Sequence, residues 1–371
     1  MTIGNKLIVP SITITGKEKL FTLKEILLGR GKGLIVHGTS FSLKRQYPLL
    51  RESLAPCGQF YQYNGREPRL QDVRDLLVRV RESECNWIVG IGGGAIIDLA
   101  KAAAGLANAG KDPEFYMQGG VIEKKGISFI AVPTTAGSGA EASINSVIIN
   151  EKTMEKLSIR DDLFLAQTVI LDPELLIEAP APIIAHSGLD AITQAIESYC
   201  SINSTCYTET MAIKGFDLLI NNLETAYDRA QDNNEGTDRA FINILTGSYL
   251  TGVAFTNSRL GVVHGIAHPL GSYYGVPHGL VCALCLVPAL EINKPYILEK
   301  YEILSQKCGM DLIEKVKQLM QKMNITNVFK GKEIINKDAI ISYTLKSGST
   351  AANPKKITPD DVECMLSGIF S

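Results

Sequence analysis

Three of the five histidines in the chain fall within fifteen residues, at His264, His268 and His278. His264 and His268 are four residues apart, so a helix would place both imidazoles on one face. Upstream, Asp190 and Gln194 have the same spacing. A carboxylate and imidazoles that converge from different helices form a site for a divalent metal with one coordination position left open. The clustering favours such a site over three unrelated core or surface histidines.

Glycines and hydroxyl side chains form a second group suited to binding phosphate. Gly92, Gly93 and Gly94 follow an apolar run and open a helical pattern, where glycine amides and the helix N-terminus suit a pyrophosphate. For the glycines alone, a tight strand-to-helix turn without a ligand is the alternative. A loop rich in hydroxyls follows the next apolar run, and loops after parallel strands meet at one edge of the sheet. The candidate nucleotide-binding residues of the two segments are Gly92, Gly93, Gly94, Asp98, Thr134, Thr135 and Ser138.

Short β-branched runs alternate with helical patterns through the first half of the chain. This alternation predicts a parallel sheet covered by helices on both faces. The expected strands are 33–36, 59–63, 87–90, 127–132 and 169–171, with helices at 42–52, 70–80 and 95–106 and a hairpin of 143–150 with 156–160. Beyond 179–182, where two prolines alternate with alanine, helical spacing dominates. We therefore expect an α/β dinucleotide-binding domain over 1–180 and an all-α domain for metal and substrate over 181–371.

The composition excludes several classes of function. The chain has 371 residues, with 37 Lys and Arg against 39 Asp and Glu. A net charge of −2 gives no excess of cations to neutralise nucleic-acid phosphates. No apolar run reaches the roughly 18 residues of a membrane span, and the N-terminus lacks a signal-peptide pattern. Eight scattered cysteines do not indicate a disulfide framework, and Cys282 and Cys285 are interpreted as buried thiols in a helix rather than a zinc pair. A cytoplasmic protein without nucleic-acid or membrane partners is expected.

In their order along the chain, these motifs resemble the iron-containing (group III) alcohol dehydrogenase family. The resemblance includes 33–36, the glycine motif at 92–101, the loop at 133–141, Gly188 to Ala191, the histidine block at 264–279 and Asn353-Pro354. It implies an N-terminal nucleotide-binding α/β domain and a C-terminal helical domain, with the site in the cleft between them. It also implies NAD or NADP, one divalent metal (Fe²⁺ or Zn²⁺), small alcohols or aldehydes as substrates, and a homodimer or larger homo-oligomer.

The resemblance also implies roles for individual residues. Gly92, Gly93 and Gly94 would cradle the pyrophosphate, with Asp98 beside it and Thr134, Thr135 and Ser138 on the nucleotide. The metal-ligand positions of the family fall on Asp190, Gln194, His264 and His278. His268 falls on the position of a histidine that is usually not a ligand and would help to move the proton as the catalytic residue.

The sequence departs from the family pattern at two positions. The usual fourth ligand is a histidine, and here it is Gln194, whose neutral carbonyl oxygen suits zinc or iron less well than imidazole does. Gly38 stands where members that prefer NAD often carry an acid for the adenosine ribose. Without that carboxylate, and with Thr39 and Ser40 as hydrogen-bond donors and Lys44 or Arg45 as cations, we expect NADP(H) to be preferred or tolerated.

Three rival interpretations use the same or a related fold. Reductases similar to maleylacetate reductase work without a metal, which Gln194 favours and Asp190 opposes. Polyol-phosphate dehydrogenases and enzymes similar to dehydroquinate synthase also combine a nucleotide domain with a metal site, but the histidine block matches the alcohol dehydrogenases better. The third is a non-enzymatic nucleotide-binding protein that has lost its metal.

Overall fold

The computed structural model describes residues 6–64, 67–153, 155–232 and 239–371. The chain divides into two compact units, one of Ile8–Glu178 and one built on Ala179–Ser371. We refer to them as the N-terminal unit and the helical unit.

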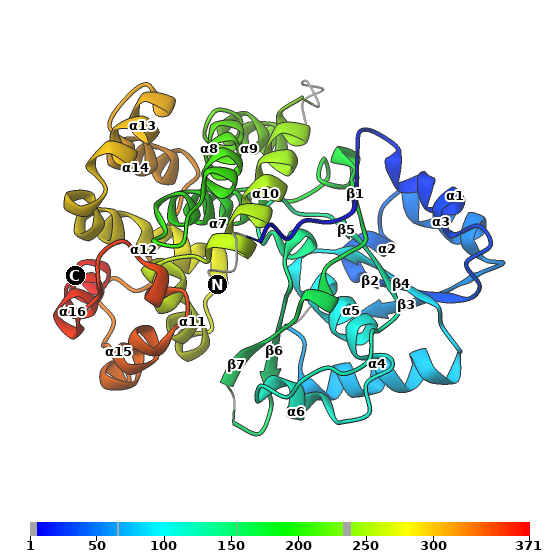
Figure 1. The fold of residues 1–371 in the computed structure, drawn as a ribbon. Coiled ribbons are helices and arrows are strands. Elements are labelled where there is room, and N and C mark those ends of the chain that lie inside the picture. The colour runs from blue at the N-terminus through cyan, green and yellow to red at the C-terminus, as the bar shows by residue number, and fades with distance from the viewer. Residues whose placement is uncertain (1–5, 65–66, 154, 233–238) are drawn as a thin grey trace. The chain divides into compact units, whose positions relative to one another are not determined.

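The N-terminal unit is organised around a six-stranded sheet (Figure 1). Its strands are all parallel and lie in the order β1-β8-β5-β4-β2-β3. The central strands β2 and β4 are buried along their whole length because the sheet is covered there. The strands are β1 (Ile12–Thr15), β2 (Gly33–Gly38), β3 (Gly58–Tyr63), β4 (Trp87–Gly92), β5 (Ser128–Pro133) and β8 (Thr168–Leu171). The predicted parallel α/β architecture is confirmed, although β1 was not predicted.

Helices connect these strands, and their apolar spacing explains how they pack. In α4 (Leu70–Glu82), the residues spaced three and four apart from Leu70 to Val80 are buried, so one face of the helix packs inward. In α5 (Gly94–Leu106) nearly every residue is buried, and its many alanines allow close packing on β4 and β5. The shorter helices of this unit are α1 (Leu23–Leu27), α2 (Thr39–Ser42), α3 (Gln46–Leu54) and α6 (Pro113–Met117).

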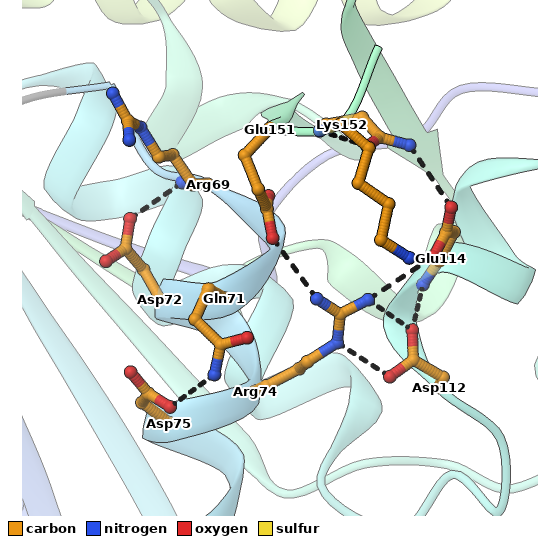
Figure 2. Close-up of polar contacts among 10 residues, drawn as sticks. Arg69, Gln71, Asp72, Arg74, Asp75, Asp112, Glu114, Glu151 and Lys152 are labelled. Atoms are coloured by element: carbon orange, nitrogen blue, oxygen red, sulfur yellow. Dashed lines mark hydrogen bonds and ion pairs between the residues drawn. The ribbon is translucent and has the colours of Figure 1, made fainter. Parts of the chain in front are cut away.

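A separate antiparallel hairpin of β6 (Asn145–Asn150) and β7 (Glu155–Arg160) is fixed to these helices by Arg74. The Arg74 guanidinium on α4 donates two hydrogen bonds to Asp112, at 2.7 and 2.9 Å, and also pairs with Glu114 and Glu151 (Figure 2). One cation thus joins α4, the start of α6 and the turn of the hairpin, and the predicted hairpin is present.

The helical unit contains no β-strand among its described residues. Its central helix is α7, which packs against α8, α9, α10 and α12. The helices are α7 (Ala181–Cys200), α8 (Cys206–Ile220), α9 (Leu223–Asp232), α10 (Arg239–Ser258), α11 (Val262–Tyr274), α12 (His278–Asn293), α13 (Leu298–Cys308), α14 (Leu312–Lys322), α15 (Lys337–Lys346) and α16 (Pro359–Phe370). Across the described residues, no helix is both long enough and apolar enough to cross a membrane.

Candidate metal centre and nucleotide-binding loops

The candidate metal centre is built from three helices of the helical unit. Asp190 comes from α7, His264 from α11, and His278 and Cys282 from the first turns of α12. One ligand atom from each of these four side chains lies within 4.8 Å of the other three. The structure therefore brings together three of the four predicted ligands and adds Cys282, which the sequence analysis had interpreted only as a buried thiol.

A close approach of α12 to α7 makes this convergence possible. A Cβ atom at Gly279 would lie 2.4 Å from the backbone oxygen of His186 on α7, so a larger residue would push the helices apart. The same point on Gly279 is 3.5 Å from Cβ of Asp190. Glycine directly after His278 thus brings the start of α12 to the carboxylate of Asp190.

One ring nitrogen of each clustered histidine lies close to the carboxylate of Asp190. His264 Nε2 lies 3.2 Å from Asp190 Oδ1, and His278 Nε2 lies 4.0 Å from the same oxygen. His264 and Asp190 are buried, while His278 is partly exposed. His278 is thus the most exposed of the four clustered residues.

Glu197 orients His264 through Nδ1, the ring nitrogen that faces away from Asp190. It lies seven residues after Asp190 on α7, so it faces the same way two turns later. Its Oε2 is 2.6 Å from His264 Nδ1, and its Oε1 accepts a hydrogen bond from the Val263 amide at 2.7 Å. A proton held on Nδ1 by this carboxylate leaves the Nε2 lone pair directed at Asp190, as metal-binding histidines require.

Two carboxylates and a thiol surround the His264 imidazole. Burial opposes protonation of His264, but its interactions with Cys282, Glu197 and Asp190 outweigh this effect and raise the pKa of the imidazole well above its usual value. Burial raises the pKa of the Cys282 thiol to about 12. The carboxylates of Asp190 and Glu197 bring negative charge to the two sides of His264, and a divalent ion would offset it.

Gln194 is also buried, one turn after Asp190 on α7. Its Oε1 has no hydrogen-bond partner among the described residues. A buried amide oxygen without a donor is costly and is satisfied by an ion or an ordered water. The four clustered side chains offer one carboxylate, two imidazoles and a thiol, a donor set that fits zinc or ferrous iron, and Gln194 lies one helical turn along α7 from Asp190.

His268 lies outside the four-residue cluster but beside it. Its ring stacks on that of His278, with centroids 5.1 Å apart and an interplanar angle of 20°. It is partly exposed on α11, one turn after His264. This position suits a group that exchanges protons next to the metal centre.

Asn353, at the end of the family resemblance, fixes the helices that carry the histidines. Its Oδ1 accepts hydrogen bonds from the Val262 amide at the start of α11 and from Asn293 at the end of α12. Its Nδ2 donates back to Asn293 Oδ1 at 2.7 Å. This reciprocal amide pair joins one end of each helix and so limits their relative movement.

The candidate nucleotide loops lie at one edge of the parallel sheet in the N-terminal unit. Gly38, Gly92 and Pro133 end the neighbouring strands β2, β4 and β5, and the register pairs Gly92 with Pro133. The Thr134 amide donates to the Gly92 carbonyl at 3.0 Å. The carboxyl edge of a parallel sheet is where α/β folds bind their ligands.

Individual glycines of the first loop have different structural requirements. A Cβ at Gly92 would lie 2.5 Å from Cβ of Ile96, and one at Gly94 would lie 2.9 Å from Ser138 Oγ. At Gly93 a Cβ would meet only Thr135, at an ordinary 3.5 Å. Gly93 is also the N-cap residue of α5 and has no side chain to bond the first amides of that helix. Such amides at a helix N-terminus can bind a phosphate.

The Asp98 carboxylate is bonded within the protein rather than left open to a ligand. Its carboxylate accepts a hydrogen bond from the Val147 amide at 3.1 Å and lies 3.7 Å from Lys101 Nζ. Burial raises its pKa to about 6. Lys101 is fully buried and donates to the backbone oxygens of Ala140 and Asn145, both at 2.6 Å. These two side chains hold the hydroxyl-rich loop and β6 against α5.

The loop after β2 combines exposed hydroxyls with cations that are already paired. Thr39 and Ser40 are exposed at the start of α2. Lys44 pairs with Glu178 at 3.3 Å, and Arg45 pairs with Glu174 at 3.2 Å. The exposed hydroxyls next to Gly38 are therefore the candidate donors, and Thr39 Oγ1 already accepts a hydrogen bond from Gln62 at 3.4 Å.

Family models match both units of the chain. One described as "Iron-containing alcohol dehydrogenase" matches residues 10–173, and one described as "Fe-containing alcohol dehydrogenase family, C-terminal" matches residues 184–370.

Individual proteins agree with this family match. Alcohol dehydrogenase 4 of Saccharomyces cerevisiae is 30% identical over 316 residues, which cover 82% of this chain and 81% of that protein. Lactaldehyde reductase of Escherichia coli K12 is 29% identical over 314 residues, 80% of each chain. The crystal structure of a 1,3-propanediol oxidoreductase has a TM-score of 0.91 at 26% identity and covers 99% of this chain and 100% of that one.

Proposed function

Because the chain belongs to the iron-containing alcohol dehydrogenase family, we propose that it is an NAD(P)-dependent reductase of small aldehydes that uses one divalent metal ion. The family makes it an oxidoreductase acting on alcohols. The observation that carries the metal-dependent form is the convergence of Asp190, His264 and His278, with Glu197 supporting His264. A metal-free reductase would not need a carboxylate and two imidazoles directed at one point.

The reaction exchanges a hydride and a proton. In reduction, C4 of the dihydronicotinamide gives a hydride to the carbonyl carbon, and the carbonyl oxygen takes up a proton to give the alcohol. The metal, when bound, supplies Lewis-acid stabilisation of the negative charge that develops on this oxygen. Oxidation of an alcohol is the same sequence in reverse.

The residues of the metal centre would bind the ion, orient its ligands and move a proton. Asp190, His264 and His278 would bind the ion, and Glu197 keeps the proton of His264 on Nδ1 so that Nε2 remains a donor atom. His268, stacked on His278, would give the substrate oxygen its proton in reduction and remove it in oxidation.

The N-terminal unit would bind the nucleotide at the edge formed by β2, β4 and β5. The pyrophosphate would lie against Gly93 and the first amides of α5, with hydroxyls of Thr134, Thr135 and Ser138 alongside. Asp98 would contribute by holding β6, which follows this loop, against α5 through the Val147 amide. Gly38 lacks a carboxylate that would repel a 2′-phosphate, and the exposed Thr39 and Ser40 supply donors, so we propose that NADPH is used at least as well as NADH.

A cofactor and substrate screen on the metal-reconstituted enzyme tests the proposal. Protein freed of metal, and the same protein given Zn²⁺ or Fe²⁺ without oxygen, are assayed with short aldehydes and either NADPH or NADH. We expect aldehyde-dependent oxidation of NADPH only after metal is added. Equal turnover without metal would favour a metal-independent reductase, and no turnover with any aldehyde would refute the reductase assignment.

A further inference from the structure

The fourth protein atom of the metal cluster is a sulfur. Cys282 Sγ lies 3.5 Å from His278 Nε2 and 4.0 Å from His264 Nε2, and it is within 4.8 Å of the ligand atom of Asp190. The Cys282 side chain is fully buried. It lies four residues after His278 on α12, so both side chains project from one face of the helix.

Two of these distances match those between ligands of a tetrahedral ion. Bonds of about 2.0 Å to nitrogen or oxygen and about 2.3 Å to sulfur separate tetrahedral ligands by about 3.3 Å for nitrogen–oxygen pairs and about 3.5 Å for nitrogen–sulfur pairs. The corresponding distances are 3.2 Å for His264 to Asp190 and 3.5 Å for His278 to Cys282. Two further pairs, each at 4.0 Å, are about 0.5–0.7 Å longer than these tetrahedral values, a difference that small side-chain rotations can close. The last two of the six pairs, His264 with His278 and Asp190 with Cys282, lie within 4.8 Å.

A sulfur ligand would also compensate for the unusual residue at position 194. Gln194 offers only a neutral amide oxygen where an imidazole would be a stronger donor to zinc or iron. A thiolate is a stronger and softer donor than an amide. Together with Asp190 it would bring two negative charges to a dication, and a coordinated thiol gives up its proton despite its burial.

We infer that Cys282 is the fourth protein ligand of the metal centre, in a set with Asp190, His264 and His278, and that its sulfur makes the centre select Zn²⁺ over Fe²⁺. This inference rests on the metal centre of the proposed function. Soft thiolate ligands favour zinc, whereas a site of only oxygen and imidazole ligands discriminates less. Gln194 is then left to hydrogen-bond a substrate or a water next to the ion.

Cobalt spectroscopy of the full-length protein tests the sulfur ligand directly. Co²⁺ is added stoichiometrically to metal-free wild type, Cys282→Ser and Cys285→Ser. Cys285 is the matched control, because it is a buried thiol on the same helix outside the cluster. A cobalt–thiolate bond gives a near-ultraviolet charge-transfer band that oxygen and nitrogen ligands do not give. We expect the band in wild type and Cys285→Ser and its loss in Cys282→Ser.

Affinities measured with a competing chelator give a second readout. We expect Cys282→Ser to bind Zn²⁺ at least about a hundredfold more weakly, above the 10–100-fold cost of losing a supporting residue. Its preference for Zn²⁺ over Fe²⁺ should shrink as well, while Cys285→Ser keeps both values.

The outcomes separate this inference from the proposed function. If wild type binds one Co²⁺ but shows no cobalt–thiolate band, the metal centre stands and the role of Cys282 is refuted. A band that persists in Cys282→Ser overturns it too. Wild type that binds no metal overturns the metal-dependent function itself. If Cys282→Ser does not fold, a band in wild type and Cys285→Ser supports the inference, because no other cysteine of the described residues belongs to the cluster.

Discussion

Replacing Glu197 by glutamine should weaken metal binding without removing any metal ligand. The Glu197 carboxylate accepts from His264 Nδ1 at 2.6 Å and from the Val263 amide at 2.7 Å, so both of its contacts require an acceptor. Glutamine has one acceptor oxygen and one NH₂ group. If the NH₂ faces His264, the imidazole proton moves to Nε2 and blocks the lone pair that would bind the ion. If it faces Val263, two donors oppose each other.

Both arrangements have a cost that can be estimated. An unsatisfied buried donor costs about 1–3 kcal/mol, which corresponds to about a 5–150-fold loss. Loss of a carboxylate that supports a metal-binding histidine reduces affinity about 10–100-fold. We therefore expect Glu197→Gln to bind Zn²⁺ about 10–100-fold more weakly than wild type, with a similar fall in activity at limiting metal.

Chelator competition, followed by metal analysis of the dialysed protein, measures this affinity. Glu291→Gln is the matched control, since Glu291 is an exposed glutamate on α12. Circular dichroism of both metal-free variants checks that they fold. Wild-type Zn²⁺ affinity in folded Glu197→Gln would refute the role given to this carboxylate.

Three further predictions concern the N-terminal unit. Gly38→Asp should lower kcat/KM for NADPH about tenfold or more and spare NADH, because Asp fits the helix N-cap and repels a 2′-phosphate; equal losses for both cofactors would contradict this. Gly93→Ala should keep the wild-type melting temperature but weaken cofactor binding in a fluorescence titration, whereas Gly92→Ala should destabilise the fold itself; unchanged binding in Gly93→Ala would move the pyrophosphate elsewhere. Burial raises the pKa of Glu141 from 4.5 to about 7, so its contribution to stability is present below pH 4.5 and lost as pH rises through 7. In urea unfolding, the free energy of unfolding of Glu141→Gln should therefore rise by about 3 kcal/mol relative to that of wild type over this pH interval. A difference between the two proteins that does not change with pH would refute this prediction.

The parallel sheet could be predicted because its central strands are continuous apolar runs that alternate with helical spacing. β2 and β4 are buried along their whole length, and burial on both faces produces such runs. β1 (Ile12–Thr15) was missed because it is a largely exposed edge strand of alternating isoleucine and threonine. Its place in the sheet depends on pairing with β8, more than 150 residues away, which no local pattern reveals.

Within the candidate metal centre, the sequence led to the residues with a recognised spacing but not to those that depend on packing. Glu197 lies two turns after Asp190, and Cys282 lies one turn after His278, so helical spacing was compatible with both. That spacing identifies a face and not its neighbours. Only the close approach of α12 to α7 at Gly279 determines that the thiol meets Asp190 rather than an apolar core.

For Asp98, sequence position suggested a place beside the nucleotide, and the structure adds a bond to the Val147 amide. Lys101 likewise holds backbone oxygens of the neighbouring loop. None of these contacts could be inferred from the sequence, since the three partner residues lie about 40 to 50 residues further along the chain.

A metal titration of the catalytic rate tests the central claim most directly. Metal-free enzyme is titrated with Zn²⁺ while aldehyde-dependent oxidation of NADPH is followed. If Asp190, His264, His278 and Cys282 hold one ion on which reduction depends, the rate should rise from near zero and level off at one equivalent. Full activity in protein shown to be free of metal, or a rate that does not change across the titration, would contradict the account.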